Sequence, residues 1–188
     1  MIIKKNFLEH SEVQTNTLKT LEHQISKSAK MISKSLKNNG LVIWCGNGGS
    51  ASDSMHISAE LLGRFKKNRK SLRSISLAGD STSITCISND FGYENLFSRQ
   101  LEGLAGKNDI LISLTTSGNS ANIINAIKKA KELNLKTILM SGKSGGKCLG
   151  LADLELIVPS ITTARIQEMH MLIGHTICEL IEQDLNLN

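Results

Sequence analysis

The chain has 188 residues, of which 40% are apolar, and its 22 lysines and arginines against 17 aspartates and glutamates give a formal net charge of +5. This length and composition predict one ordinary globular domain over residues 1–188 and argue against a disordered chain. The apolar run Leu41–Cys45 is far shorter than the about 20 residues of a membrane-spanning helix, and no apolar stretch follows the first lysines as in a secretory signal. Four scattered cysteines without a C-x-x-C pair indicate buried, reduced thiols and a cytoplasmic protein.

In chain order, the spacing of apolar residues predicts a helix over Val13–Leu36 that ends at Asn38-Asn39-Gly40. The predicted strands are Leu41–Cys45, Leu72–Leu77, Asp109–Leu114, Lys136–Met140 and Leu154–Val158. The further predicted helices are Ala51–Phe65, Ser81–Ile87, Glu94–Leu104, Ser120–Leu133 and Thr162–Leu185, with a turn at Asn89–Gly92. Strands that alternate with helices predict an α/β fold, here a three-layer αβα sandwich with a five-stranded parallel sheet.

Residues 1–38 form an N-terminal helical extension whose apolar stripe must be buried. Because helices are already predicted for both faces of the sheet, a subunit contact is favoured over packing on the chain's own sheet. A second surface feature is the basic cluster of Lys66, Lys67, Arg69, Lys70 and Arg73. It has no interleaved aromatic residues, which favours a solvated helix end and loop over a nucleic-acid patch.

Two glycine-containing loops, Gly46–Ser50 and Thr115–Ser120, each follow a strand and open a helix. Free backbone N–H groups and the positive end of a helix dipole bind anions at such a place. The first loop also fits the dinucleotide pattern G-x-G-x-x-A, but that site needs an acidic residue about 20 residues on, and Asp80 is too far. The second loop has four hydroxyls, whereas an N-cap needs only one, and no Walker lysine follows it.

Two pairs of side chains are candidates for a catalytic or metal-binding site. His56 and Glu60 are four residues apart and share a helix face, so they form an exposed pair, a proton-transfer pair or part of a metal site. On the last helix, Gln167 and His175 differ by about 80° in bearing and reach one cleft, whereas His170 lies on another bearing and is predicted to be structural.

Five motifs together make a specific resemblance that covers nearly the whole chain. They are Cys45-Gly-Asn-Gly-Gly-Ser50, Met55-His56 with Glu60, Ser88-Asn-Asp-Phe-Gly92, Thr116-Ser-Gly-Asn-Ser120, and Ala164-Arg-Ile-Gln-Glu-Met-His170 with His175. In these the chain resembles the bacterial phosphoheptose isomerases, which carry a sugar isomerase (SIS) domain. The resemblance implies a homotetramer with active sites at subunit contacts. It implies conversion of sedoheptulose 7-phosphate to D-glycero-D-manno-heptose 7-phosphate, the first step toward heptose for lipopolysaccharide, capsule or glycoprotein precursors.

Site residues follow from the resemblance position by position. Glu60 corresponds to the catalytic base and His175 to the second acid/base. Positions that hold zinc in some family members are His56, Glu60, Gln167 and His175. Sugar-phosphate contacts correspond to Asn47, Gly48, Gly49, Ser50, Glu60, Asn89, Asp90, Thr115, Thr116, Ser117, Ser120 and Gln167. Two departures are visible: Thr115 replaces the usual serine and keeps the hydroxyl, and Ala164 replaces an aspartate of some members.

Isomerisation of a ketose to an aldose moves a proton from C1 to C2, which suits a carboxylate, and a hydrogen between O1 and O2, which suits an imidazole. We therefore expect Glu60 to act at carbon and His175 at oxygen, although a glutamate bound tightly to zinc is a poorer base. The second loop is expected to bind the phosphate and the first the sugar oxygens.

The rival hypothesis is a non-catalytic SIS-domain regulator that binds the replication initiator protein. Such relatives lack the glutamate and the second histidine, so the presence of both favours the enzyme. A nicotinamide oxidoreductase ranks third.

Overall fold

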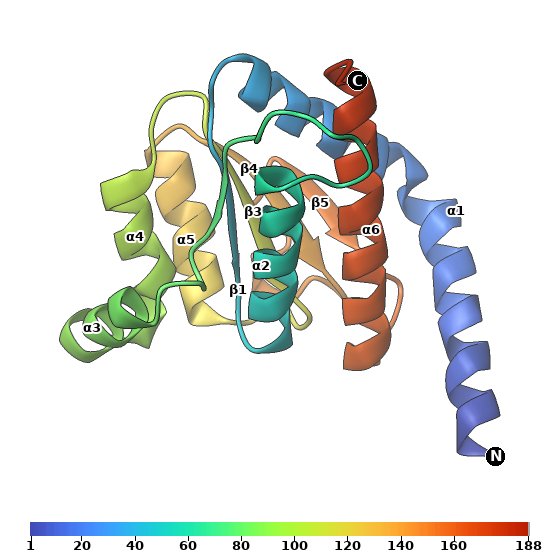
Figure 1. The fold of residues 1–188 in the computed structure, drawn as a ribbon. Coiled ribbons are helices and arrows are strands. Elements are labelled where there is room, and N and C mark those ends of the chain that lie inside the picture. Colours follow the sequence, from blue (N-terminus) through green and yellow to red (C-terminus); the bar gives the residue numbers. More distant parts are fainter. Residues whose placement is uncertain (188) are drawn as a thin grey trace.

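The computed structural model describes residues 1–187 and shows a central sheet of five parallel strands (Figure 1). The strands are β1 (Val42–Gly46), β2 (Ser74–Ser76), β3 (Ile110–Thr115), β4 (Lys136–Ser141) and β5 (Leu154–Ile157). Their order is β2-β1-β3-β4-β5, and the register places Trp44 of β1 beside Ser76 of β2 and Ile112 of β3. The predicted five-stranded parallel sheet is confirmed.

Six α-helices surround the sheet in the described part of the chain. They are α1 (Ile2–Lys37), α2 (Gly49–Leu62), α3 (Ser81–Phe91), α4 (Leu96–Leu104), α5 (Ala121–Glu132) and α6 (Thr163–Asp184). Two short 3-10 helices, η1 (Tyr93–Asn95) and η2 (Gly146–Cys148), complete the elements.

Successive side chains of the buried strands point into two different cores, as the two-residue period of a strand requires. Val42 and Trp44 of β1 face a core shared with α1, α2 and α6. Ile43 and Cys45 face a second core shared with α4 and α5. The two cores lie on opposite faces of one sheet, each between the sheet and a layer of helices. The predicted three-layer arrangement is therefore confirmed.

Several element boundaries differ from the prediction, most of all in α1, α2 and α3. Helix α1 begins at Ile2, eleven residues early, because neither proline nor glycine interrupts the chain before Gly40. Helix α2 begins at Gly49 rather than Ala51 and ends at Leu62. The turn predicted at Asn89–Gly92 is wrong: α3 continues to Phe91, and the chain leaves the helix only at Gly92, where φ is +83°.

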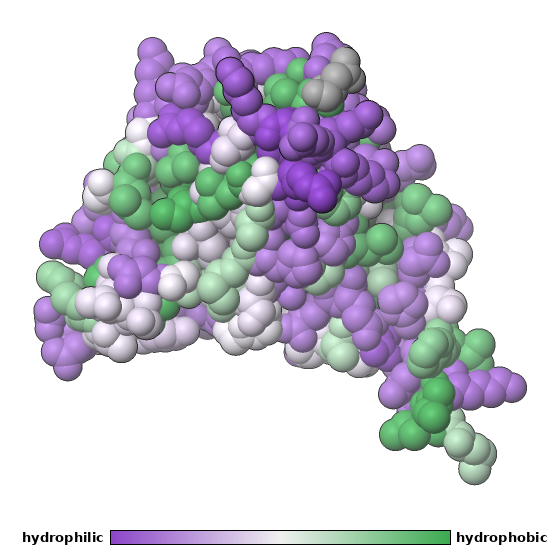
Figure 2. Space-filling view, in the orientation of Figure 1, coloured by the Kyte–Doolittle hydropathy of each residue, from purple (hydrophilic) through white to green (hydrophobic). Residues whose placement is uncertain are grey.

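Helix α1 packs against the domain along its C-terminal part, whereas its N-terminal residues are exposed to solvent. Leu21, Ala29 and Ile32 pack into the core that α1 shares with α6, so for this part of the stripe the favoured prediction of a subunit contact is wrong. The first residues project beyond the domain, and Ile2 and Phe7 are each 73% exposed there (Figures 1 and 2). Within residues 1–187, no helix combines the length and apolarity needed to cross a membrane.

All four cysteines are free thiols. Cys45, Cys148 and Cys178 are buried, as predicted, but Cys86 is exposed because it lies on α3, a helix with no buried residue.

Candidate functional site

The central strands β1 and β3 place both glycine-containing loops at one edge of the sheet. These strands are neighbours, and from them the chain continues to β2 on one side and to β4 on the other. In open parallel sheets ligands bind outside the carboxyl ends of the strands where the order reverses in this way. The loops after β1 and β3 therefore flank the expected binding crevice.

In the first loop, Asn47 is fixed by a network that the sequence did not reveal. Its side-chain amide exchanges two hydrogen bonds with that of Asn122, at 2.9 and 2.8 Å, and the Tyr93 hydroxyl donates to Asn47 Oδ1 at 2.8 Å. Asn122 is 2% exposed in the first turn of α5, and its buried amide is satisfied by this exchange, which no local feature of the sequence indicates.

Gly48 and Gly49 shape the start of α2. Gly48 has φ of +56°, a conformation that favours glycine, and a Cβ on Gly49 would lie 2.0 Å from Gln167 Nε2. The side chain of Gln167 thus lies against the backbone of the first loop, and within residues 1–187 it makes no hydrogen bond of its own. Ser50 beside it is buried.

In the second loop, two of the four hydroxyls accept hydrogen bonds from the backbone of the loop, and the other two make no hydrogen bond in the described part of the chain. Thr115 Oγ1 accepts the N–H of Gly118 at 3.2 Å, and Ser117 Oγ accepts the N–H of Asn119 at 3.2 Å. Ser120 occupies the N-cap of α5, yet its hydroxyl makes no capping bond. Like the hydroxyl of Thr116, it makes no hydrogen bond in the described part of the chain.

A second group of side chains lies between α2 and α6. His56 Nε2 is 3.2 Å from Glu60 Oε1 and 3.5 Å from His175 Nε2. The helices approach closely enough because Gly174 faces Ile57: a Cβ on Gly174 would lie 2.7 Å from the Ile57 side chain. The missing Cβ brings the neighbouring histidines of the two helices together.

The donor atoms of His56, Glu60 and His175 all lie within 4.8 Å of one another and fit a metal ion. Nitrogen and oxygen ligands about 2.1 Å from a tetrahedral zinc ion are about 3.4 Å apart, close to the separations seen here. Two imidazoles and a carboxylate are also the donors that zinc accepts. Gln167, the fourth predicted metal position, precedes His175 by eight residues, about 12 Å along the axis of α6, and its role as a ligand stays a prediction.

Within a single chain, the predicted site residues therefore lie in two groups. Glu60 follows Gly49 by eleven residues, which places it about 16 Å along α2 from the first loop. Asn89 and Asp90 join neither group. They are exposed at the end of α3, where Asn89 Nδ2 donates to Asp90 Oδ1 at 2.8 Å.

Comparison with known proteins assigns the family. Residues 7–142 match the SIS domain. The chain is 49% identical over 182 residues to a phosphoheptose isomerase of Helicobacter pylori, with 97% of this chain and 95% of the relative covered. It is 47% identical over 184 residues to that of Aliarcobacter butzleri, with 98% and 97% covered. The chain belongs to the phosphoheptose isomerase family of SIS-domain proteins.

A solved structure extends the family assignment to three dimensions. The phosphoheptose isomerase of Francisella tularensis superposes with a TM-score of 0.93 at 38% identity and covers 96% of each chain. The resemblance seen in the sequence motifs is thereby confirmed, together with the SIS-domain fold. The roles carried over to single residues stay predictions.

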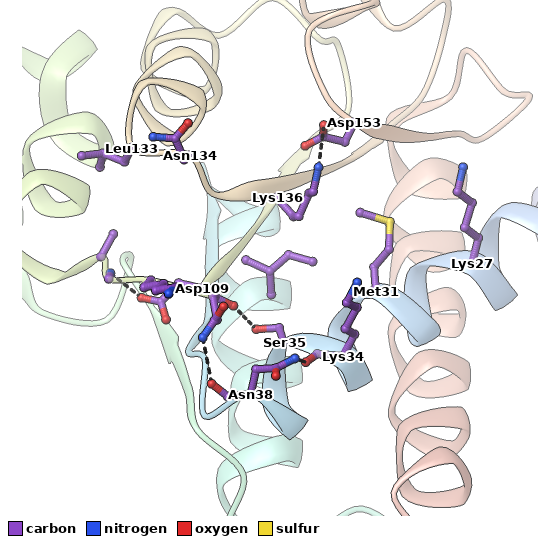
Figure 3. Close-up of a pocket in the computed structure, with 15 residues that line it drawn as sticks. Lys27, Met31, Lys34, Ser35, Asn38, Asp109, Leu133, Asn134, Lys136 and Asp153 are labelled. Atoms are coloured by element: carbon purple, nitrogen blue, oxygen red, sulfur yellow. Dashed lines mark hydrogen bonds and ion pairs between the residues drawn. The ribbon is translucent and has the colours of Figure 1, made fainter.

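This phosphoheptose isomerase family member also has a cavity of about 970 Å³ at the opposite edge of the sheet, beside α1 and the amino ends of β3 and β4 (Figure 3). Its two carboxylates hold backbone in place. Asp109 accepts the N–H groups of Leu41 and Gly106, each at 2.7 Å, and Asp153 accepts the N–H of Thr137 at 2.8 Å. None of the predicted site residues lines this cavity, so its size does not make it the active site.

Proposed function

We propose that this protein is a phosphoheptose isomerase that converts sedoheptulose 7-phosphate to D-glycero-D-manno-heptose 7-phosphate in the cytoplasm. The observation that carries the proposal is the cluster of His56, Glu60 and His175 in a chain nearly half identical to enzymes of that name. Four free cysteines agree with a reducing compartment.

Glu60 and His175 perform the two proton movements. The Glu60 carboxylate takes the proton from C1 of the ketose and returns it to C2, and His175 transfers the hydrogen between O1 and O2. C2 thereby becomes the carbinol carbon and C1 the aldehyde, so no redox partner is required. His56, at 3.2 Å from Glu60, orients the carboxylate.

The loop after β3 binds the phosphate. The free hydroxyls of Thr116 and Ser120 and the N-terminus of α5 supply donors and positive potential for a dianion. We assign the sugar oxygens to Asn47, Gly48, Gly49, Ser50 and Gln167 at the neighbouring loop. Asn89, Asp90, Thr115 and Ser117 remain further proposed contacts.

We propose that His56, Glu60 and His175 hold one zinc ion in each subunit. A bound zinc ion would stabilise negative charge on the oxygens of the reacting carbons. Gln167, the fourth ligand that the resemblance implies, lies about 12 Å along the helix from His175, and we propose it both as a ligand to the metal and as a substrate contact.

We further propose a homotetramer in which the site is completed across subunits. A seven-carbon sugar phosphate has its phosphate and its reactive carbons at opposite ends, and Glu60 is about 16 Å along α2 from the first loop of its own chain. The exposed apolar start of α1 offers a contact surface for assembly.

The test is to incubate the purified protein with sedoheptulose 7-phosphate and to follow the aldose product by NMR. Glu60→Gln is expected to lower kcat by about 100-fold or more without changing the unfolding midpoint. Glu132→Gln, which alters an exposed glutamate at the end of α5, is the matched control. Normal turnover by a folded Glu60→Gln variant would refute the assignment of the base.

A chelator tests the metal separately. It is expected to lower the rate, and added zinc is expected to restore it. Full activity after complete metal removal would contradict the zinc proposal and leave the isomerase proposal standing.

A further inference from the structure

The loop between α2 and β2, residues 63–73, is built around a buried ion pair rather than solvated throughout. Arg69 Nε donates to Glu182 Oε1 of α6 at 2.9 Å, and the two side chains are only 1% and 3% exposed. Arg69 belongs to the basic cluster that was predicted to be solvated, and for this residue the prediction is wrong. Lys66, Lys67 and Lys70 of the same cluster are exposed as predicted.

Glu182 also fixes the backbone of this loop. Its carboxylate accepts the N–H groups of Phe65, Lys66 and Lys67 at 3.3, 3.1 and 3.1 Å. Burial alone would raise the pKa of Glu182, but the bonds from Arg69 and from the three N–H groups hold it below the ordinary value. A single carboxylate of α6 therefore ties down three consecutive residues.

The remaining nitrogens of Arg69 bind the last carbonyl groups of α2. Nη2 donates to the carbonyl oxygen of Glu60 at 2.8 Å, and Nη1 donates to that of Leu61 at 2.9 Å. Carbonyl groups at a helix C-terminus lack partners within the helix, and a guanidinium there supplies both hydrogen bonds and a favourable charge. Arg69 thus fixes the end of the helix that carries the proposed base.

The same loop places an aromatic ring on the proposed acid/base. The rings of Phe65 and His175 are stacked, with centroids 5.4 Å apart and an interplanar angle of 11°. His56 meets the His175 ring edge-on, with centroids 5.2 Å apart. The His175 ring is therefore in contact with Phe65 through its face and with His56 through an edge.

We propose that Arg69, Glu182 and Phe65 are positioning residues for the isomerase reaction. The buried pair locks the loop onto α2 and α6 at once, and Phe65 carries that constraint to the His175 ring. This inference rests on the proposed function of Glu60 and His175. Its physical basis is that a misplacement of about 1 Å in a catalytic group can cost about 100-fold in rate.

The decisive variants are at Phe65, because they leave the buried ion pair intact. Phe65→Leu removes the stacked ring and keeps an apolar side chain, whereas Phe65→Tyr restores the ring. We expect Phe65→Leu to lower kcat about ten-fold or more while KM changes less than about three-fold, and Phe65→Tyr to recover most of the loss. Lys67→Ala, in the same loop with an exposed side chain, is the control and is expected to match wild type.

A spectroscopic measurement reads the ring position without turnover. With ¹³C-labelled histidine, the Hε1 resonance of His175 in wild type is expected to carry the shielding of the stacked Phe65 ring. This resonance should move downfield in Phe65→Leu and lie near its wild-type position in Phe65→Tyr. The unfolding midpoint of each variant should equal that of wild type. An unchanged resonance, or a kcat that Phe65→Leu leaves intact, would overturn the proposal.

Arg69→Lys tests the ion pair itself. Lysine keeps the charge but lacks the planar set of donors that reaches Glu182 and the Glu60 carbonyl together. If this variant folds, its kcat and its His175 resonance are expected to change in the direction seen for Phe65→Leu, and wild-type values would count against the inference. If it does not fold, the Phe65 variants still decide.

An inactive wild-type protein would refute the proposed function instead, since the resonance comparison does not depend on activity.

Discussion

Among single residues, His170 shows how burial selects one protonation state. Its side chain is 1% exposed, its Nε2 lies 3.2 Å from the carbonyl oxygen of Ser141, and its Nδ1 has no partner within residues 1–187. Burial lowers the pKa of His170 to about 4, although the hydrogen bond to Ser141 acts in the opposite direction. The imidazole is therefore neutral in the folded protein, with the proton on Nε2 facing the carbonyl, as the predicted structural role requires.

This pKa makes folding stability sensitive to mild acid. An unfolded histidine has a pKa near 6.5, so between about pH 6.5 and 4 the unfolded chain binds the extra proton and stability falls as pH falls. Between pH 7.5 and 5 the loss from His170 is expected to be about 2 kcal/mol. Denaturant titrations at the two pH values measure it. His170→Asn should lose less stability between the two pH values than wild type does. The control His23→Asn, at an exposed histidine of α1, should lose as much stability as wild type. An equal loss in wild type and His170→Asn would contradict the assignment.

The residues that the sequence could and could not predict differ in a physical way. His56, Glu60 and His175 were predictable because helical spacing puts the first two on one face and the motifs supply the third. Arg69 was not, since its partner Glu182 is 113 residues away and nothing local distinguishes a buried arginine from its exposed neighbours. Asn122 was missed for the same reason, because its partner Asn47 lies on another element.

At the scale of elements, the contact between α2 and α6 determines the geometry of the cluster of His56, Glu60 and His175. A Cβ on Gly174 would lie 2.7 Å from both Cγ1 and Cδ1 of Ile57, which is itself fully buried. Gly174→Ala must therefore push the helices apart or displace Ile57, at a cost of about 1–3 kcal/mol. The same shift separates His56 from His175.

We expect Gly174→Ala to lower both the free energy of unfolding and the affinity for zinc, measured by denaturant titration and by competition with a chromophoric chelator. Gly103→Ala is the matched control, because a Cβ on Gly103 in α4 meets nothing within 4 Å. That substitution should be neutral or stabilising by up to about 1 kcal/mol. Wild-type zinc affinity in Gly174→Ala would show that the close helix contact does not set the cluster.

Element types were predictable because strands and helices alternate with clear apolar periods, and all five strands were found at nearly their observed positions. Boundaries were less so. The turn assigned to Asn89–Gly92 was wrong because asparagine and aspartate also occur in the last turn of a helix, and only Gly92 ends α3. The separation of Glu60 from the first loop was also not evident, since it depends on where α2 begins and how far it runs.

For the whole molecule, α1 is the feature that a single chain leaves unexplained. Its exposed end contacts the domain through Arg165 of α6, which donates to the Asn6 carbonyl at 3.2 Å and lies 3.7 Å from Glu9. Ile2, Ile3 and Phe7 are each 73% exposed on this projecting end of the helix. An apolar surface of this kind fits the proposed assembly of identical subunits.

Phe7→Glu is expected to shift the protein to smaller species in light scattering, with loss of turnover, because a charge would be buried in the contact. Leu149→Glu, at a side chain that is 55% exposed and outside α1, is the control and should keep the wild-type mass. A Phe7→Glu variant with unchanged mass would exclude this end of α1 from the interface.

A mixing experiment tests whether one site draws on two subunits. Glu60→Gln removes the proposed base, and the double variant Thr116→Val/Ser120→Ala removes the free hydroxyls of the phosphate loop, so each alone should be nearly inactive. If every site takes Glu60 from one subunit and the loop from another, random co-assembly of the two variants produces intact sites at about one position in four. Co-expressed variants should then recover about a quarter of wild-type activity. If both groups came from the same chain, mixed assemblies would stay inactive, and the substrate would have to reach Glu60 within one subunit.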